Sequence, residues 1–228
     1  IHFQIGFNKR FYYGYRQAKK LLQRGELGRL SGINARFWFQ PGRRDAMLHN
    51  GIHFFDLVPF FMGPVREVFA RSAKLSPADP QGAAPETLSV SMQFESGAVG
   101  NLLLSSAGSW DYINEHVDLI GSNHNVLSVE NGRQLRLCRR GEDQPTQLYE
   151  NTLSVHWWSG NEEQGFTLQL RAFAQKILSG SNLPSSPDDI LSMCAGAEDG
   201  IRSLGLMEAI KSSLARNSTV SLAPSICQ

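Results

Sequence analysis

A long stretch in which apolar and polar residues alternate at every second position most constrains the fold of this chain. The alternation runs from Val65 to about Tyr149 and is clearest in Thr87–Glu95, where the apolar side chains all fall on one side. A period of two is typical of a strand with one buried face. Asn131-Gly132, between two such segments, is the strongest hairpin signal in the chain. The stretch therefore predicts a mostly antiparallel sheet with one polar face.

Helical and extended segments precede this region. Residues 1–7 predict a short strand, residues 11–24 a helix and residues 30–40 a long strand. A second helix is predicted around His53 and is closed by Gly63. Pro59 lies inside it and is expected to kink it or end it early, because proline cannot donate a helical hydrogen bond.

Two further helices follow. An apolar stripe at helical spacing predicts the buried face of the first one. The stripe consists of Phe166, Leu170, Phe173 and Ile177. The second helix is predicted to start at Ser186-Pro187 and to run to about Arg216. Helices at both ends with strands between them predict an α+β fold: a large, mostly antiparallel open sheet with helices packed on one face.

Composition excludes several classes of function. The 228 residues carry a formal net charge of +1 that is spread along the chain, which argues against a nucleic-acid footprint or a basic membrane arm. No run approaches the roughly 18 apolar residues of a membrane span. Three widely spaced cysteines without a Cys-x-x-Cys pair favour a reducing compartment. We therefore expect a cytoplasmic protein with no nucleic-acid or membrane partner.

The helix around His53 holds the most distinctive chemistry. His49, His53 and Asp56 share one helix face beside the apolar face. A histidine titrates near neutral pH and can exchange a proton during a reaction. The spacing also fits a buried histidine that is bonded to a backbone carbonyl. A zinc site is a third alternative, but the zinc-protease pattern needs Glu where Asn50 stands, so we expect no metal.

Other familiar chemistries lack their motifs. The chain contains no nucleophile elbow, no phosphate-binding lysine motif and no G-x-G-x-x-G dinucleotide fingerprint. These residues alone are therefore not expected to bind a dinucleotide. Trp157-Trp158 fits either a sugar-binding surface or a half-buried packing anchor.

Several motifs together resemble one known family. Gly6–Phe11 reads GFNKRF and Gly25–Gly28 reads GELG, which is similar to the start of the C-terminal domain of the Gfo/Idh/MocA oxidoreductases. Lys9 stands where arginine is commoner in that family. Gly51–Leu57 reads GIHFFDL and resembles the family's G-x-H-x-x-D-L segment. Residues 163–189 are similar to the MviM-like branch, so the resemblance covers essentially the whole chain.

The resemblance implies a fold and an activity. In the family, an N-terminal Rossmann domain binds NAD or NADP, and a C-terminal domain like that of glyceraldehyde-3-phosphate dehydrogenase carries the substrate site. Residues 1–228 would then be the substrate-binding and oligomerisation domain, with the dinucleotide-binding domain missing upstream. The implied reaction transfers hydride between nicotinamide and a hydroxyl or carbonyl group of a sugar, cyclitol or nucleotide sugar. The alternative is a non-catalytic sugar-binding or scaffold protein on the same fold.

The resemblance also assigns residues. His53 matches the histidine that acts as acid and base, with Asp56 as its supporting partner. The expected substrate-binding residues are Asn8, Lys9, Arg10, His49, Asn50 and Trp157. The family usually has Asp at the position of His49, and losing that carboxylate would disfavour a protonated His53. The free polar face of the predicted sheet suggests a homodimer or larger assembly.

Overall fold

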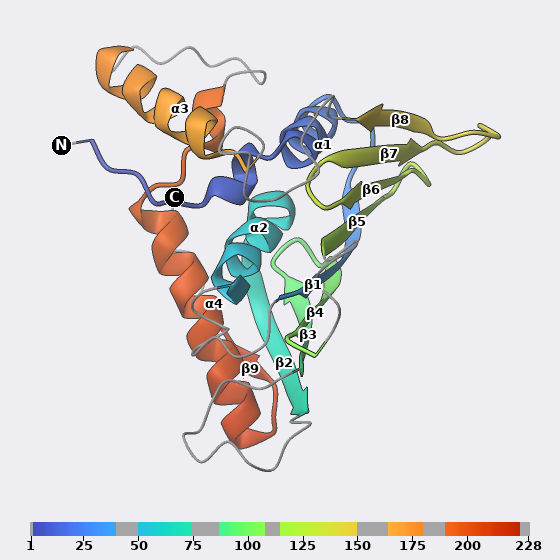
Figure 1. Cartoon of the computed structure of the whole chain (residues 1–228). Helices are drawn as coiled ribbons and strands as arrows, with labels where there is room; N and C mark the ends of the chain where they lie inside the picture. Colours follow the sequence, from blue (N-terminus) through green and yellow to red (C-terminus); the bar gives the residue numbers. More distant parts are fainter. Residues whose placement is uncertain are drawn as a thin grey trace.

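One nine-stranded sheet forms the centre of the molecule (Figure 1). The computed structural model describes residues 2–39, 50–73, 87–107, 115–149, 164–179 and 190–223. The strands are β1 (Leu30–Trp38), β2 (Val65–Ala73), β3 (Thr87–Phe94), β4 (Val99–Ser105), β5 (Glu115–Gly121), β6 (Val126–Glu130), β7 (Gln134–Cys138), β8 (Thr146–Tyr149) and β9 (Val220–Ser221). Their order is β8-β7-β6-β5-β1-β4-β3-β2-β9. The predicted α+β fold is confirmed.

Strand β1 joins two hairpin runs. It pairs with β4 in parallel and with β5 antiparallel, and every other neighbouring pair among the described strands is antiparallel. On one side β2, β3 and β4 follow one another as hairpins, and on the other side β5 to β8 do so. The predicted hairpin at Asn131-Gly132 connects β6 to β7, and both residues adopt positive φ angles of 51° and 65°. Such angles suit Asn and Gly.

The helices lie on one face of the sheet and at one of its corners. They are α1 (Tyr13–Gln23), α2 (Ile52–Met62), α3 (Phe166–Ser179) and α4 (Ala197–Arg216), with 3₁₀ turns η1 (Asn8–Phe11) and η3 (Ile190–Met193). Figure 1 shows α2 and α4 against the sheet, while α3 stands apart beside the N-terminal segment. The main core fills the space between the sheet and α1, α2 and α4. A separate small cluster of Phe11, Ala172 and Met193 holds α3. No helix among the described residues is long and apolar enough to cross a membrane.

Sequence predictions about three of these elements are wrong in whole or in part; for Pro59 the error is the expected early end of the helix. In residues 2–7 only Ile5 makes a β-bridge, to Ala195, so no strand forms there. Helix α2 passes Pro59 and continues to Met62, because the lost hydrogen bond is only one turn from the end, where Gly63 N–H donates to the Pro59 carbonyl at 2.8 Å. The last helix begins at Ala197 rather than at residue 186, because η3 and the bridge at Ala195 come before it.

A fourth prediction concerned the buried face of α3. Phe166, Leu170 and Ile177 are exposed, by 41%, 69% and 46%. The residues that α3 buries are Gln169 and Ala172, on a different side of the helix. Helix α3 therefore packs on this domain through Gln169, Ala172 and the partly buried Leu168, and its apolar stripe is not part of the domain core.

Candidate functional site

The site forms where η1 meets the first turns of α2. All four residues of η1 are buried, including the polar Asn8, Lys9 and Arg10. Buried polar groups need partners. Each of these three side chains finds one on a different element, so η1 ties together parts of the chain that lie far apart in sequence.

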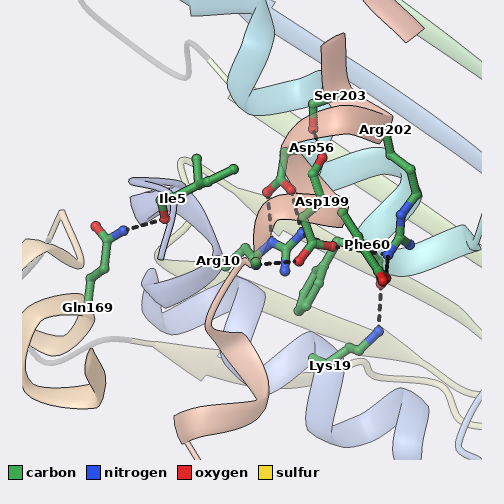
Figure 2. A network of polar contacts seen from close by, with 11 residues as sticks. Ile5, Arg10, Lys19, Asp56, Phe60, Gln169, Asp199, Arg202 and Ser203 are labelled. Carbon is green, nitrogen blue, oxygen red and sulfur yellow. Dashed lines mark hydrogen bonds and ion pairs between the residues drawn. The ribbon is translucent and has the colours of Figure 1, made fainter. Parts of the chain in front are cut away.

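Arg10 is the centre of an ion-pair network that links η1, α2 and α4 (Figure 2). Its Nε donates to Asp56 Oδ2 at 2.8 Å, and its Nη2 donates to the other oxygen of the same carboxylate. Nη2 also lies 3.0 Å from Asp199 Oδ1. Burial raises the pKa of Asp56 to about 6, although Arg10 favours the charged form, so the pair remains ionic at pH 7. This two-pronged contact fixes α2 relative to η1.

Phe60 of α2 lies between two cations. The Arg10 guanidinium is 4.6 Å from the centre of its ring, and the Lys19 ammonium is 4.3 Å from it. Lys19 also donates to the Phe60 carbonyl at 2.6 Å (Figure 2). Burial, and then the charge of Arg10, lower the pKa of Lys19 to about 8. Helix α1 is thereby joined to α2 as well.

Lys9 pairs with Glu115 of β5. The hydroxyl of Tyr15 donates to the other oxygen of this carboxylate at 3.0 Å. The ammonium also lies 4.7 Å from the ring centre of Phe37 and 5.5 Å from that of Phe54. Burial alone would lower the pKa of Lys9, but Glu115 outweighs it and holds the pKa above its usual value. Lys9 is thus a fixed positive charge in an aromatic enclosure.

His53 is the residue of α2 that feels this charge. Burial, and then the charge of Lys9, lower the pKa of His53 to about 4, so the imidazole is neutral at pH 7. Its Nδ1 atom is buried, and no residue that the structure describes forms a hydrogen bond with it. The Phe7 ring packs edge-on against the imidazole, with 6.4 Å between ring centres. A neutral imidazole with an unused nitrogen can accept or share a proton.

Asn8 and Asn50 complete the described part of the predicted site. Asn8 is buried, and its side-chain amide donates to the Gln164 carbonyl at 3.0 Å. Asn50 is partly exposed in a wide turn that leads into α2. Gly51 follows in a tight place, where a Cβ atom would lie 3.0 Å from Leu104. Asn8, Lys9 and Arg10 therefore have protein partners, and their direct contact with a substrate stays a prediction.

His49 and Trp157 lie outside the described residues. The structure therefore gives no geometry for the position where the family expects a carboxylate, or for the tryptophan surface. The zinc alternative depended on His49. Within the described ranges, no three His, Cys, Asp or Glu side chains gather to hold a metal ion.

Sequence reasoning missed Glu115, Tyr15 and Asp199. A signal for Glu115 exists, because it occupies an inward position in the alternation that Val117 and Leu119 continue on β5. A carboxylate in an apolar phase indicates a buried partner. Tyr15 and Asp199 carry no comparable mark, since a tyrosine on a buried stripe and an acid in a first helical turn are common.

The described residues do not fit a dinucleotide. Among them, the one parallel strand pair, β1 and β4, is connected through two further strands, and no glycine-rich turn leads from a strand into a helix. A βαβ unit with such a turn is what holds the pyrophosphate in dinucleotide-binding folds. The residues that the structure describes therefore offer no such unit to hold the pyrophosphate of a dinucleotide.

Comparison with known proteins places this geometry in context. The sequence profile of the GFO/IDH/MocA C-terminal domain matches residues 15–126. No curated protein matches the chain. Among solved structures, levoglucosan dehydrogenase in complex with NADH and levoglucosan has a TM-score of 0.76 at 16% identity, covering 97% of this chain and 66% of its own.

Two other solved structures are similar to the same extent. Aldose-aldose oxidoreductase from Caulobacter crescentus, complexed with glycerol, has a TM-score of 0.73 at 20% identity, over 96% of this chain and 63% of its own. An oxidoreductase from Agrobacterium radiobacter in complex with NAD⁺, L-tartaric acid and magnesium has a TM-score of 0.71 at 19% identity, over 96% and 64%. At such identities the likeness shows the fold, and the chain spans slightly less than two thirds of these proteins.

Proposed function

Because the chain belongs to the GFO/IDH/MocA family as a C-terminal domain, we propose that it is the substrate domain of an NAD- or NADP-dependent oxidoreductase. The intact enzyme transfers hydride between nicotinamide and a hydroxyl or carbonyl group of a sugar, cyclitol or nucleotide sugar. Residues 1–228 bind the substrate and form the oligomer contact, and a dinucleotide-binding domain precedes them. Levoglucosan, the compound in one related structure, is an anhydro sugar and belongs to this chemical class.

The neutral His53 with its unused Nδ1 is the observation that carries this proposal. When a hydroxyl carbon loses hydride to nicotinamide, the hydroxyl must also lose a proton, which needs a base near it. His53 is neutral at pH 7 and can take that proton. Lys9 opposes a lasting charge on the ring, so the proton is passed on rather than kept. Asp56 supports His53 indirectly by fixing α2 through Arg10.

The partly exposed position of Asn50, just before α2, suits a group that orients the substrate over His53. Trp157 would offer an apolar surface to a sugar ring. His49 replaces the family carboxylate, so a relay of protons away from His53 would run through an imidazole instead of an acid. Cys138 has an exposed, free thiol, which supports a reducing cytoplasmic location.

Turnover of the intact protein tests the role of His53. With NAD⁺ and NADP⁺ and a panel of sugars and cyclitols, His53→Asn is expected to lower kcat by about 100- to 10,000-fold, because the proton acceptor is lost. His124→Asn is the matched control. His124 lies in the exposed turn after β5 with φ 62°, a conformation that asparagine also adopts readily. Equal kcat for His53→Asn and the parent would remove His53 from the mechanism.

The alternative is a non-catalytic sugar-binding or scaffold protein, which the imidazole at position 49 favours. Calorimetric titration of the intact protein with NADH and NADPH separates the two proposals. Binding of either nucleotide supports the oxidoreductase. Sugar binding without nucleotide binding and without any turnover would establish the alternative.

A further inference from the structure

Helix α3 carries an apolar stripe that lacks a counterpart in this domain. Phe166, Leu170 and Ile177 are 41%, 69% and 46% exposed, and Phe173 between them is half-buried. They follow one another at steps of four, three and four residues and therefore share one face of the helix. We call these four side chains the α3 stripe. Contiguous exposed apolar side chains mark interaction sites.

The other side of α3 is firmly attached to the candidate site. Ala172 packs with Phe11 of η1, and Asn8 of η1 donates to the Gln164 carbonyl just before the helix. Gly165 lies so close to η1 that a Cβ atom would be 2.6 Å from the Asn8 carbonyl oxygen. The helix is thus fixed to the turn that also carries Lys9. Whatever binds the α3 stripe is held in a defined relation to His53.

The beginning of the described chain lies against the same helix. Gln169 of α3 donates to the Ile5 carbonyl at 3.0 Å, and Gln4 donates to the Gln169 carbonyl at 3.5 Å. Figure 1 shows the N-terminal segment beside α3, and Figure 2 shows Gln169 reaching Ile5. Ile5 N–H also donates to Ala195 at 2.9 Å. A domain that precedes residue 1 would therefore emerge next to the α3 stripe.

We propose that the α3 stripe is the docking surface for the dinucleotide-binding domain of the intact protein. The inference rests on the proposed function, which requires such a domain. About a third of each related chain lies outside the part that this chain covers, since the matched share is 63–66%. Ile201 and Leu204 of α4, 70% and 49% exposed, extend apolar surface near Gly200, which packs against Ile5. Docking here sets the position of nicotinamide over His53.

A photo-cross-linker in the intact protein tests the occupant of this surface. Benzoylphenylalanine in place of Leu170 is expected to cross-link to residues upstream of Ile1 in the same chain. The same group in place of Leu178, which is 85% exposed on another side of α3, is the control and is expected to give little or no cross-link to upstream residues, because no C–H bond of that domain lies beside it. Cross-links from position 170 only to a second copy, only to residues 1–228, or to nothing would overturn the proposal.

A pair of charge substitutions gives an independent readout. Leu170→Glu is expected to lower kcat/KM for NAD(P)H by about tenfold or more, because a charge would be buried at the contact, while Leu178→Glu changes it less than about twofold. Equal effects of the two variants would contradict docking at the stripe. If the parent protein has no nucleotide-dependent activity, the proposed function fails, and the cross-link from position 170 still decides where the upstream domain lies.

Discussion

At the scale of single residues, Lys9 and His53 show how one buried charge sets the protonation of a neighbour. Lys9 is held positive by Glu115 inside an aromatic enclosure, and its charge, added to burial, disfavours imidazolium at His53. The resemblance alone pointed to the same outcome through His49, which removes a carboxylate. The structure gives a second cause of the lowered His53 pKa, which is the charge of Lys9. His49 lies outside the described residues, so its effect on that pKa stays a prediction.

The depressed pKa of His53 makes stability depend on pH. His53 has a pKa of about 4 in the folded protein and an ordinary value of 6.5, so the unfolded chain binds the proton more tightly. The free energy of unfolding therefore has its full value, as far as His53 is concerned, above pH 6.5. As the pH falls from 6.5 towards 4, protonation of this residue in the unfolded chain lowers the free energy of unfolding by about 3 kcal/mol. Urea unfolding at several pH values should show this loss in the parent but not in His53→Asn. Parallel pH profiles for the two proteins would contradict it.

The Lys9–Glu115 pair should behave as a coupled unit. Lys9→Met leaves Glu115 buried without its cation and is expected to cost about 3–5 kcal/mol of unfolding free energy. Glu115→Gln leaves the Lys9 ammonium buried without its carboxylate and should cost a similar amount of unfolding free energy. The double variant is expected to be more stable than the sum of the single losses predicts, because neither charge is left unpaired. Strict additivity in urea unfolding would show that the two charges do not interact.

At the scale of elements, most of the strands were predictable, and the surface that covers the apolar face of one helix was not. A period of two in residues 87–95 gave β3 almost to the residue, since alternation reports directly on a sheet with one buried face. The stripe on α3 was predicted to be buried and is largely exposed in this domain, because periodicity carries no information about what covers a helix face. Glu115 was visible only as a carboxylate out of phase, and its pairing with Lys9 depends on a contact between distant segments.

The hairpin between β6 and β7 offers a test of close packing. Gly132 has a φ of 65°, and a Cβ atom there would lie 2.2 Å from Tyr12 at the start of α1. Gly97, in the turn before β4, has a φ of 85° with nothing within 4 Å. Gly97→Ala should cost only the backbone strain, about 1–2 kcal/mol. Gly132→Ala should cost about 1–3 kcal/mol more, because the methyl group overlaps Tyr12.

Urea unfolding of the two glycine variants measures this difference directly. Equal losses of stability for Gly132→Ala and Gly97→Ala would mean that Tyr12 and α1 can move away from the new methyl group without loss of stability. The hairpin would then not anchor α1.

At the scale of the whole molecule, we propose that the open face of the sheet binds a second copy of the protein. His116, Asp118 and Ser128 form hydrogen bonds there, with His116 Nε2 2.8 Å from Asp118 Oδ1. Val99 and Ile120 flank Gly32 in register and are 58% and 42% exposed. A face with paired polar groups around apolar ones resembles the composition of protein interfaces. We expect a homodimer or larger assembly through this face.

Leu103 lies on the same face, opposite Arg36 of β1, and is 37% exposed. Leu103→Lys brings a second cation beside Arg36 and is expected to reduce the molar mass of the intact protein to that of the monomer in light-scattering chromatography. Leu178→Lys, on α3, should leave the mass unchanged. A monomeric parent protein, or an unaltered assembly in Leu103→Lys, would contradict an interface on this face.

The central place of β1 has a consequence for synthesis on the ribosome. Ala35 of β1 pairs with Leu102 on one side and with Val117 on the other. The middle strand of the sheet is therefore made early and stays without neighbours until β4 and β5 emerge. During that interval an apolar strand has both edges open, which is the condition that favours aggregation and chaperone binding. Completion of β5 is thus the step of translation that protects the nascent chain.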